Sequence, residues 1–398
     1  MTKKRNSITD LRGAGRLAID AVNGVIDIVE AMHYNITSLG GILGNKKKRP
    51  SGITGLVYKN IRSITGIAGK GFDVLLGKLS VIVNEKEPTP EQEALLAALN
   101  GVIGDHLLKT NNPLAIHMHL RKNGKPLTSE SPFFTDAVEA GKKIVLLIHG
   151  SCMNDLQWNR KGHDHGAALA EDFGYQTVYL HYNSGRHISE NGKELSDLLD
   201  SAFGKIPVEN ELVILTHSMG GLVARSAWHY GLQASHKWLK RVKKIIFLGT
   251  PHHGSPLEQT GNWIDTMLAS NTYSAPIAKL GKLRSAGVTD MRYGNIIDED
   301  WNRNDRFEPL GDQRTPVPLP IDVDCFAAAA VISDVSTSLR DEVIGDGLVP
   351  LYSALGRHEN PAFNLNFPED HVFIVRNAKH LDLLQHPEIY SCIKKWVQ

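Results

Sequence analysis

The chain has 398 residues, of which 41% are apolar and 22% are charged, so it can bury a sizeable core in one large domain or two. This composition argues against intrinsic disorder. The net charge of +1 conceals an asymmetry, because residues 1–80 hold thirteen Lys or Arg against five Asp or Glu. Such a segment is typical of contact with an anionic membrane, polymer granule or nucleic acid.

The cysteines and the hydropathy of the chain indicate where in the cell the protein is expected. Cys152, Cys325 and Cys392 are too few and too scattered for a disulfide framework, which favours a reducing environment. The basic amino terminus is not followed by an uninterrupted apolar stretch of about 7 to 15 residues, so we expect no secretory signal. No apolar run approaches the roughly 18 to 20 residues of a membrane-spanning helix. We therefore expect a cytoplasmic protein, either soluble or bound peripherally to a membrane.

Residues 1–110 are predicted to form an amphipathic helical region. Apolar residues recur at helical spacing over residues 17–32 and 53–79, and a third helix opens at "TPEQ" with Thr89 as its cap. Two roles for the apolar faces stay open. They pack on each other and on the rest of the chain, or residues 1–80 make peripheral contact with a membrane or lipid surface. We expect no nucleic acid partner.

Over residues 111–398 the pattern changes to strands that alternate with helices. Four short apolar runs are typical of buried strands: "KKIVLLIHG", "QTVYLHYN", "ELVILTHS" and "KKIIFLGTP". Further strands are expected at "DVDCFAAAAVI" and "HVFIVRN", and an antiparallel hairpin at "LAIHMHLRKNGKPL". This alternation predicts an α/β catalytic domain with a mostly parallel central sheet and helices on both faces. The long connection before "DVDCFAAAAVI" predicts an inserted cap at about residues 255–320.

The stretch "ELVILTHSMGGLVAR" passes from a buried strand directly into a helix. Ser218 is the central residue of this turn, where we expect a strained backbone and a hydroxyl exposed above the sheet, the position of a nucleophile. Gly220 supplies the small residue that such a turn requires two positions later. Two positions earlier Thr216 stands where glycine is usual, and we expect the turn to tolerate its hydroxyl.

A serine nucleophile needs a histidine base and a carboxylate that orients the histidine. His380, which follows the last predicted strand, is favoured as the base over His371 and His386. Asp346 in "IGDGLVP" is favoured as the acid, because its flanking glycines let the backbone fold the carboxylate toward the edge of the sheet. Two other aspartates qualify by position, namely Asp334 and Asp341.

Negative charge on a tetrahedral intermediate requires backbone N–H donors. We expect one donor from Met219, directly after the serine, and the other from Ser151 in the loop after "IVLLIHG", with Cys152 as the alternative. The segment "GHDHG" offers His163, Asp164 and His165 as metal ligands, but neighbouring histidines in a loop need further ligands for a closed metal site. We expect neither a metal nor a cofactor.

Five motifs occur in a fixed order: "VLLIHG", "THSMGGLVARS", "FLGTPHHGSP", "GDGLVP" and "KHLDLL". With them, residues 140–398 resemble the α/β-hydrolase superfamily and, within it, the lipases and the PGAP1-like serine esterases. The resemblance implies an α/β-hydrolase fold. It also implies roles for five residues: Ser218 as nucleophile, Asp346 as acid, His380 as base, and Ser151 and Met219 as oxyanion-hole donors.

The resemblance implies a serine carboxylic-ester hydrolase of lipid metabolism, a lipase or esterase that cleaves a hydrophobic acyl ester through an acyl-enzyme. An acyltransferase is a close alternative, because the same acyl-enzyme can pass its acyl group to an alcohol. Another alternative is a lipid- or polymer-surface binding protein that uses the hydrolase fold as a scaffold. In several bacterial lipases the aspartate of an "HLD" triplet helps to bind calcium, but no second ligand to accompany Asp382 is identifiable.

Overall fold

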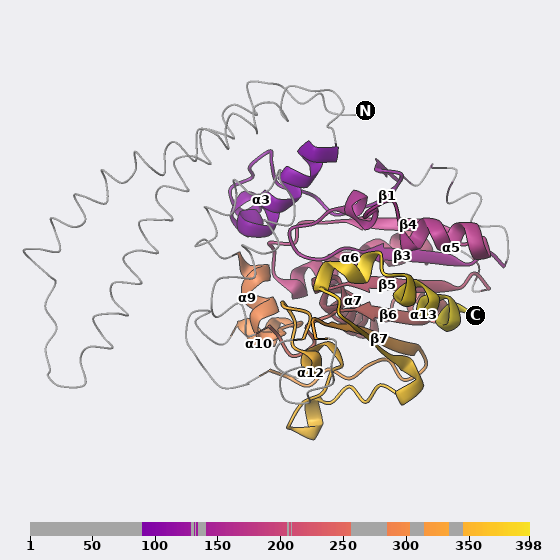
Figure 1. Ribbon diagram of the computed structural model, residues 1–398. Helices are drawn as coiled ribbons and strands as arrows, with labels where there is room; N and C mark the ends of the chain where they lie inside the picture. Colours follow the sequence, from indigo (N-terminus) through magenta and orange to yellow (C-terminus); the bar gives the residue numbers. More distant parts are fainter. Residues whose placement is uncertain are drawn as a thin grey trace, which may run out of the picture.

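The computed structural model describes residues 90–128, 131, 133, 141–204, 207, 209–255, 285–302, 314–333 and 345–398 of the chain (Figure 1). The two amphipathic helices expected before residue 80 and much of the expected cap lie outside these ranges. In the described part of the chain, no helix is both long enough and apolar enough to cross a bilayer.

One sheet of eight strands runs through the protein in the order β2-β1-β4-β3-β5-β6-β7-β8. The strands are β1 (His119–Lys122), β2 (Lys125–Pro126), β3 (Ile144–Ile148), β4 (Gln176–His181), β5 (Leu212–His217), β6 (Val242–Leu248), β7 (Asp324–Val331) and β8 (Val372–Arg376). β1 pairs antiparallel with β2 and β4, and the other pairings are parallel. The mostly parallel sheet and the antiparallel hairpin are therefore confirmed.

Helices cover both faces of this sheet. They are α3 (Pro90–Lys109), α5 (His165–Phe173), α6 (Ile188–Phe203), α7 (Met219–Ala234), α9 (Ala286–Tyr293), α10 (Asp298–Trp301), α12 (Leu351–Ala354) and α13 (Pro387–Val397), with short turns η1 (Asp155–Trp158), η2 (Lys237–Arg241), η5 (Pro361–Phe363), η6 (Glu369–His371) and η7 (His380–Leu384). The step from β3 to β4 runs opposite to the steps from β4 to β5 and from β5 to β6. Because parallel crossovers are right-handed, α5 lies on one face and α6 and α7 on the other.

The central strands explain why the apolar runs predicted the sheet. β3 and β5 are buried at every position, as expected for parallel strands that are covered on both sides. β7 differs in side-chain size, because residues 327–330 are four buried alanines. α12 and η7 both pack against β7. Small side chains along this strand let those two elements lie close to the sheet.

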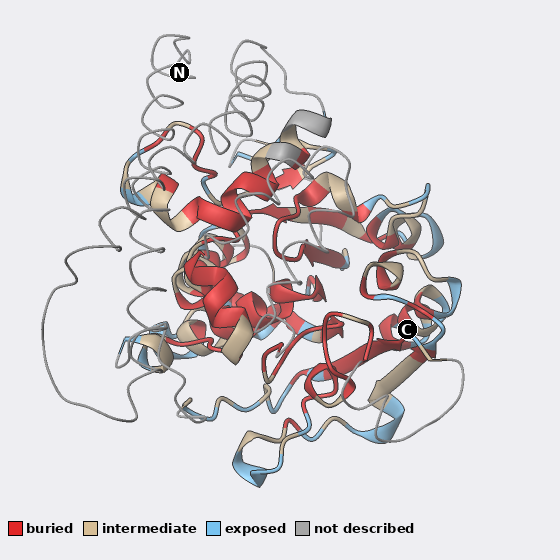
Figure 2. Cartoon of the chain, turned by 60° about the vertical axis from the view of Figure 1, so that its left-hand side comes forward, coloured by how far each residue is buried: buried red, intermediate tan, exposed pale blue. Residues whose placement is uncertain are grey.

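The amino-terminal helix α3 shares the core of the sheet domain. Its residues Ala98, Leu99, Val102 and Leu107 are buried in the same hydrophobic cluster as the central strands, and Figure 2 shows the buried residues of helices and strands joined in one interior. The division of the chain at residue 110 stays a prediction. Helix α3, which precedes residue 110, is nevertheless packed onto the α/β core.

Helices α9 and α10 lie in the described part of the expected cap, and they are fixed to α6. The Asp290 carboxylate of α9 accepts hydrogen bonds from the Ile188 amide at 2.9 Å and from His187 Nδ1 at 2.8 Å. The His187 ring also stacks on Trp301 of α10, with ring centroids 3.7 Å apart. These contacts join α9 and α10 to the amino-terminal end of α6.

Helices α6 and α7 approach each other closely at a glycine. A Cβ at Gly192 of α6 would lie 2.1 Å from Ser226 Oγ and 2.4 Å from Ser226 Cβ on α7. No side chain fits between the two helices at this point. The absence of a side chain at 192 therefore sets the distance between them.

Replacing Gly192 with alanine is expected to lower the free energy of unfolding by about 1 to 3 kcal/mol, because the added methyl overpacks this contact. The loss is expected although alanine is favoured over glycine within a helix by about 1 kcal/mol. Urea denaturation measures it. The control is Asp197→Ala on the same helix, where the side chain is 78% exposed. A Gly192→Ala protein as stable as this control would contradict the tight contact.

Candidate active site

The chain turns from β5 into α7 at Ser218. The Ser218 backbone has φ 55° and ψ −126°, outside the helical and extended regions, and such a conformation persists only where the surrounding structure enforces it. Gly220 allows the turn, because a Cβ there would lie 2.3 Å from the Ile148 carbonyl oxygen of β3. The turn therefore has the strained strand-to-helix geometry that the sequence predicted.

Thr216, the departure from the usual glycine, is accommodated inside the sheet. The residue is fully buried, and a buried hydroxyl without a partner is destabilising. Thr216 Oγ1 donates a hydrogen bond to the Ile246 carbonyl oxygen of β6 at 3.1 Å. This hydrogen bond satisfies the hydroxyl, and the turn forms two residues later.

His380 and Asp346 form a buried pair. His380 Nδ1 lies 2.6 Å from Asp346 Oδ2, and the two side chains are 2% and 1% exposed. An ionised carboxylate only accepts hydrogen bonds, so Nδ1 donates and Nε2 of the neutral ring is left as a proton acceptor. Asp346 Oδ1 accepts from the amides of Leu348 and Val349 at 2.9 and 2.8 Å. The glycines on both sides of Asp346 have positive φ, which lets this turn form.

The fold brings His380 to the turn that holds Ser218. The His380 ring centroid lies 4.7 Å from that of His217, the residue before Ser218, and His217 Nε2 lies 3.4 Å from the His380 carbonyl oxygen, to which it donates. Within the described residues, Ser218 Oγ and His380 Nε2 are both buried and have no hydrogen-bond partner. In a serine hydrolase the proton passes between these two atoms, and their hydrogen bond is often loose until substrate binds.

Ser218 is fully buried, so the expectation of a hydroxyl exposed above the sheet is wrong. The loop after β3 lies directly against it, since a Cβ at Gly150 would come within 3.0 Å of Ser218 Cβ. A local motif places a residue in a turn. Packing against a distant loop decides its exposure.

Of the two expected oxyanion-hole donors, Met219 directly follows Ser218, and Ser151 directly follows Gly150, which packs against Ser218. Ser151 and Met219 are both fully buried, and among the described residues neither backbone N–H has an acceptor. The alternative donor, Cys152, is already occupied, because its N–H donates to Ser184 Oγ at 3.0 Å. Ser151 and Met219 therefore remain the pair of free amides beside the serine.

The structure does not place the rival candidates for base and acid beside Ser218. His371 Nδ1 donates to the Cys325 carbonyl oxygen at 3.0 Å, and His386 Nδ1 accepts from the Glu388 amide and caps α13. Both histidines therefore make structural contacts away from Ser218. Two rival acids, Asp334 and Asp341, lie outside the described residues.

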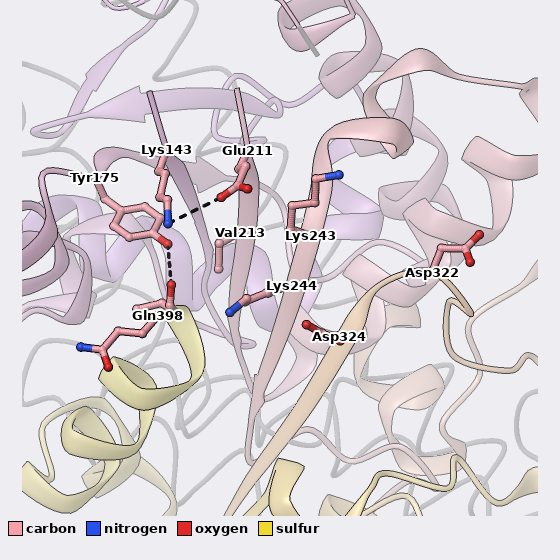
Figure 3. Close-up of a pocket in the computed structure, with 10 residues that line it drawn as sticks. Lys143, Tyr175, Glu211, Val213, Lys243, Lys244, Asp322, Asp324 and Gln398 are labelled. Atoms are coloured by element: carbon pink, nitrogen blue, oxygen red, sulfur yellow. Dashed lines mark hydrogen bonds and ion pairs between the residues drawn. The ribbon is translucent and has the colours of Figure 1, made fainter. Parts of the chain in front are cut away.

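A crevice of about 260 Å³ opens at the amino ends of the strands. Figure 3 shows it with Lys143 directed at Glu211, 3.7 Å apart, and with Asp324 on its far side. Ser218 lies at the carboxyl end of β5, where ligands of open α/β sheets bind. The crevice is therefore separate from the candidate active site.

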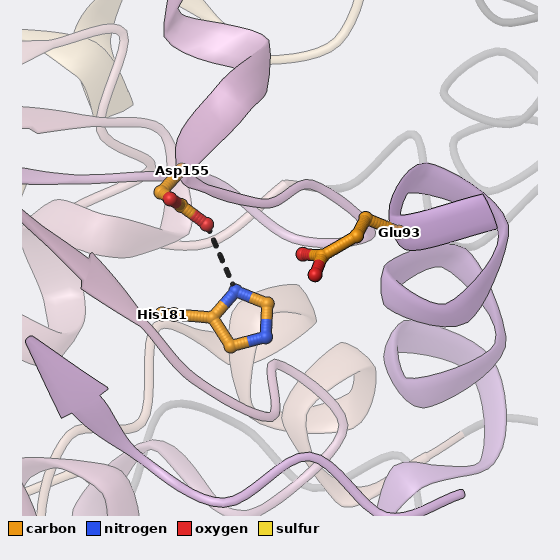
Figure 4. A group of neighbouring side chains, drawn as sticks. All are labelled: Glu93, Asp155 and His181. Atoms are coloured by element: carbon orange, nitrogen blue, oxygen red, sulfur yellow. Dashed lines mark hydrogen bonds and ion pairs between the residues drawn. The ribbon is translucent and has the colours of Figure 1, made fainter. Parts of the chain in front are cut away.

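One cluster in the described part of the chain has ligand atoms close enough to hold a metal ion. Glu93 of α3, Asp155 of η1 and His181 of β4 offer atoms within 4.8 Å of one another (Figure 4). The Arg121 guanidinium, however, lies 2.5 Å from Glu93 and 3.1 Å from Asp155. Arg121 thus already supplies the positive charge that these carboxylates need.

The other candidate metal ligands are engaged within the protein. His163 Nε2 lies 2.8 Å from His165 Nδ1, and His165 Nε2 donates to the Leu383 carbonyl oxygen at 2.9 Å. Burial lowers the pKa of His165 to about 4. The Asp382 carboxylate accepts from the Lys379 amide at 3.0 Å and from a nearby glutamine side chain at 3.1 Å. These contacts give the residues structural roles in the loops around the site.

Parts of the chain are similar to known proteins. Residues 139–315 match the family described as the PGAP1-like alpha/beta domain. Among solved structures the chain is similar to mature Bacillus licheniformis lipase BlEst2, with 16% identity, a TM-score of 0.43 and coverage of 71% of this chain and 98% of that one. Aspergillus fumigatus lipase B has 12% identity, a TM-score of 0.38 and coverage of 69% and 54%. No curated protein matches the chain.

The α/β-hydrolase fold and the PGAP1-like resemblance are thereby confirmed. The family match includes Ser151, Ser218 and Met219 but ends before Asp346 and His380. The roles of the last two residues therefore rest on their geometry in this chain.

The buried ring of His149 predicts that the stability of the protein depends on pH. Its ring stacks on Tyr182, donates from Nδ1 to the Gly150 carbonyl oxygen at 2.8 Å and is fully buried, and this burial lowers the pKa of His149 to about 3. Below about pH 6.5 the unfolded chain binds a proton here that the folded chain does not bind. The free energy of unfolding is therefore expected to fall as the pH falls from about 6.5 toward 3.

In His149→Gln the free energy of unfolding is expected to depend less steeply on pH in this range, by up to about 1.4 kcal/mol per pH unit. The reason is that the unfolded variant binds one proton fewer, whereas the folded state binds none at this position in either protein. Denaturant titrations at several pH values measure it. The control is His117→Gln, which replaces a histidine exposed on the surface. An identical slope in wild type and His149→Gln would show that His149 is protonated equally in both states.

Proposed function

We propose that this chain, which has the α/β-hydrolase fold and matches the PGAP1-like alpha/beta domain over residues 139–315, is a serine carboxylic-ester hydrolase that acts on hydrophobic acyl esters. One observation carries the proposal: the buried hydrogen bond of 2.6 Å between His380 and Asp346 lies beside the strained turn that holds Ser218. A nucleophile, a base and an orienting acid are the minimum set for acyl transfer through serine.

In the first half of the proposed reaction, Ser218 Oγ attacks the acyl carbonyl carbon while His380 Nε2 takes the hydroxyl proton. Asp346 stays ionised, keeps the Nδ1 proton in place and stabilises the imidazolium. The negative charge on the carbonyl oxygen is met by the N–H groups of Ser151 and Met219. The intermediate collapses, the alcohol leaves with the proton from His380, and the acyl group stays on Ser218.

In the second half, His380 Nε2 takes a proton from water, whose oxygen attacks the acyl carbonyl carbon. The same two N–H groups hold the new oxyanion. Collapse returns the proton to Ser218 Oγ and releases the carboxylic acid. Ser218, Asp346 and His380 are all buried. The exclusion of water from such a site favours an uncharged acyl ester over a charged substrate.

Ser218→Ala is expected to lower kcat/KM at least about 10³-fold, since the nucleophile is lost. Hydrolysis of p-nitrophenyl esters from acetate to palmitate measures the loss and reports the preferred acyl length. A fluorophosphonate probe is expected to label wild type at Ser218 only. The matched control is Ser226→Ala, which removes another buried α7 hydroxyl without a partner among the described residues. Unchanged hydrolysis or labelling in Ser218→Ala would refute the proposal.

We also propose that residues 1–80 bring the enzyme to an anionic lipid surface. The support is the excess of Lys and Arg in this segment, which lies outside the described residues. A basic residue near such a surface contributes about 1 kcal/mol to binding. Clustered lysines at 46–48 would then account for much of the attraction.

Changing the three lysines at 46–48 to glutamate is expected to lower co-flotation with phosphatidylserine-containing vesicles at least about tenfold. Vesicles of phosphatidylcholine alone are expected to float little protein in either case. The matched control reverses three exposed lysines of the hydrolase domain: Lys125, Lys161 and Lys240. Equal loss in both triple variants would mean that net charge, and not this segment, drives binding.

A further inference from the structure

Helix α3 lies directly against the loop that carries Ser151, which we call the oxyanion loop (residues 149–155). A Cβ at Gly101 of α3 would lie 2.3 Å from Cys152 Sγ, 2.8 Å from Cys152 Cα and 2.9 Å from the Cys152 backbone nitrogen. Two of these three atoms belong to the backbone, so even a methyl group at position 101 would displace the loop. Glycine at this position lets the helix and the loop pack backbone against backbone.

Cys152 has a backbone conformation that needs support from outside the loop. Its φ is 59°, a region that residues with a Cβ rarely adopt. Its N–H donates to Ser184 Oγ at 3.0 Å, and the residue is only 6% exposed. Because Cys152 directly follows Ser151, the contacts that hold Cys152 also fix the position of the Ser151 peptide.

The same helix holds the segment that supplies Ser184. Asn183 Nδ2 donates to the Gly104 carbonyl oxygen of α3 at 2.9 Å. A Cβ at Gly185 would lie 2.1 Å from the Asn100 carbonyl oxygen, also on α3. The two neighbours of Ser184 are therefore both in close contact with the helix, and the hydroxyl that fixes Cys152 depends on that contact.

A buried ion network joins α3 to the far end of the oxyanion loop. Arg121 Nη1 lies 2.5 Å from Glu93 Oε2 on α3 and 3.1 Å from Asp155 Oδ1, the last residue of the loop. The three side chains are 9%, 13% and 2% exposed. Breaking a pair as buried as this one is strongly destabilising. The helix thus contacts the loop at Cys152 and, through Arg121, at Asp155.

We propose that α3 is a positioning element for the oxyanion hole, acting through Gly101 on Cys152 and through Asn183 on Ser184. This inference rests on the proposed function. α3 sets the direction of the Ser151 N–H, which meets negative charge only in the transition state. Displacing the helix therefore weakens transition-state stabilisation and leaves substrate binding nearly unchanged.

The test is Gly101→Ala in the full-length chain. Its kcat for the best p-nitrophenyl ester is expected to fall about 10- to 100-fold with KM within about twofold of wild type, the pattern of an interaction made only in the transition state. Affinity for an alkyl boronic acid, a transition-state analogue, is expected to fall by a similar factor. The matched control is Gly231→Ala on α7, where a Cβ would crowd Ser196 Oγ at 2.9 Å. Its kcat is expected to stay at the wild-type value.

A second measurement follows the contact without using catalysis. Maleimide labelling read by mass spectrometry is expected to leave Cys152 protected in wild type and to reach it at least about tenfold faster in Gly101→Ala, because displacement of the loop exposes the thiol. Cys325, equally buried at 6%, is an internal control that is expected to stay protected in both proteins. Should Gly101→Ala fail to fold, Asn183→Asp serves instead, because it replaces the donor facing Gly104 with an acceptor of the same size.

The outcomes separate this inference from the proposed function. Faster labelling of Cys152 with unchanged kcat would overturn the inference, as would equal loss of kcat in the Gly231→Ala control. Protected Cys152 in a folded Gly101→Ala protein would overturn it as well. A wild type that hydrolyses no ester would refute the proposed function, and the labelling rates would still decide whether α3 holds the loop.

Discussion

The site depends on the close approach of the turn between β5 and α7 to the neighbouring strand β3. Gly220 lies against the Ile148 carbonyl oxygen with no room for a side chain. This contact holds Ser218 in a backbone conformation that is unfavourable in an unconstrained chain. Two fully buried central strands enforce the strain. Ser218 is therefore held as rigidly as the sheet, and the other groups of the site are placed relative to it.

Asp346 and His380, the proposed acid and base, are placed near that turn differently, on loops held by backbone contacts. Two amides hold one oxygen of Asp346, so its other oxygen can face only His380. The His380 ring fits because position 249 has no side chain, since a Cβ there would lie 3.0 Å from His380 Cε1. Because these amides and the carboxylate are already in place, they need not rearrange when positive charge develops on the imidazole.

Local signals in the sequence predicted the parts of the fold that depend on local rules. Buried runs gave the parallel strands, and the glycines beside Asp346 indicated a turn that can present a carboxylate. The burial of Ser218 was missed, and so were Ser184 and the network around Arg121. Each of these depends on residues far apart in the chain, as with Arg121 between Glu93 and Asp155. Neither spacing nor composition marks such pairs, because only the folded chain brings them together.

The four alanines of β7 have a consequence for how such a site can be tuned. η7, which begins at His380, packs on this strand, so small side chains on the face of β7 toward η7 let the segment that carries His380 lie close to the sheet. A larger residue on that face would push η7 away from the sheet, and His380 with it, without changing the identity of Ser218, Asp346 or His380. Variation in a buried strand that contributes no residue to the proposed site is thus a route by which related sequences could change the position of His380.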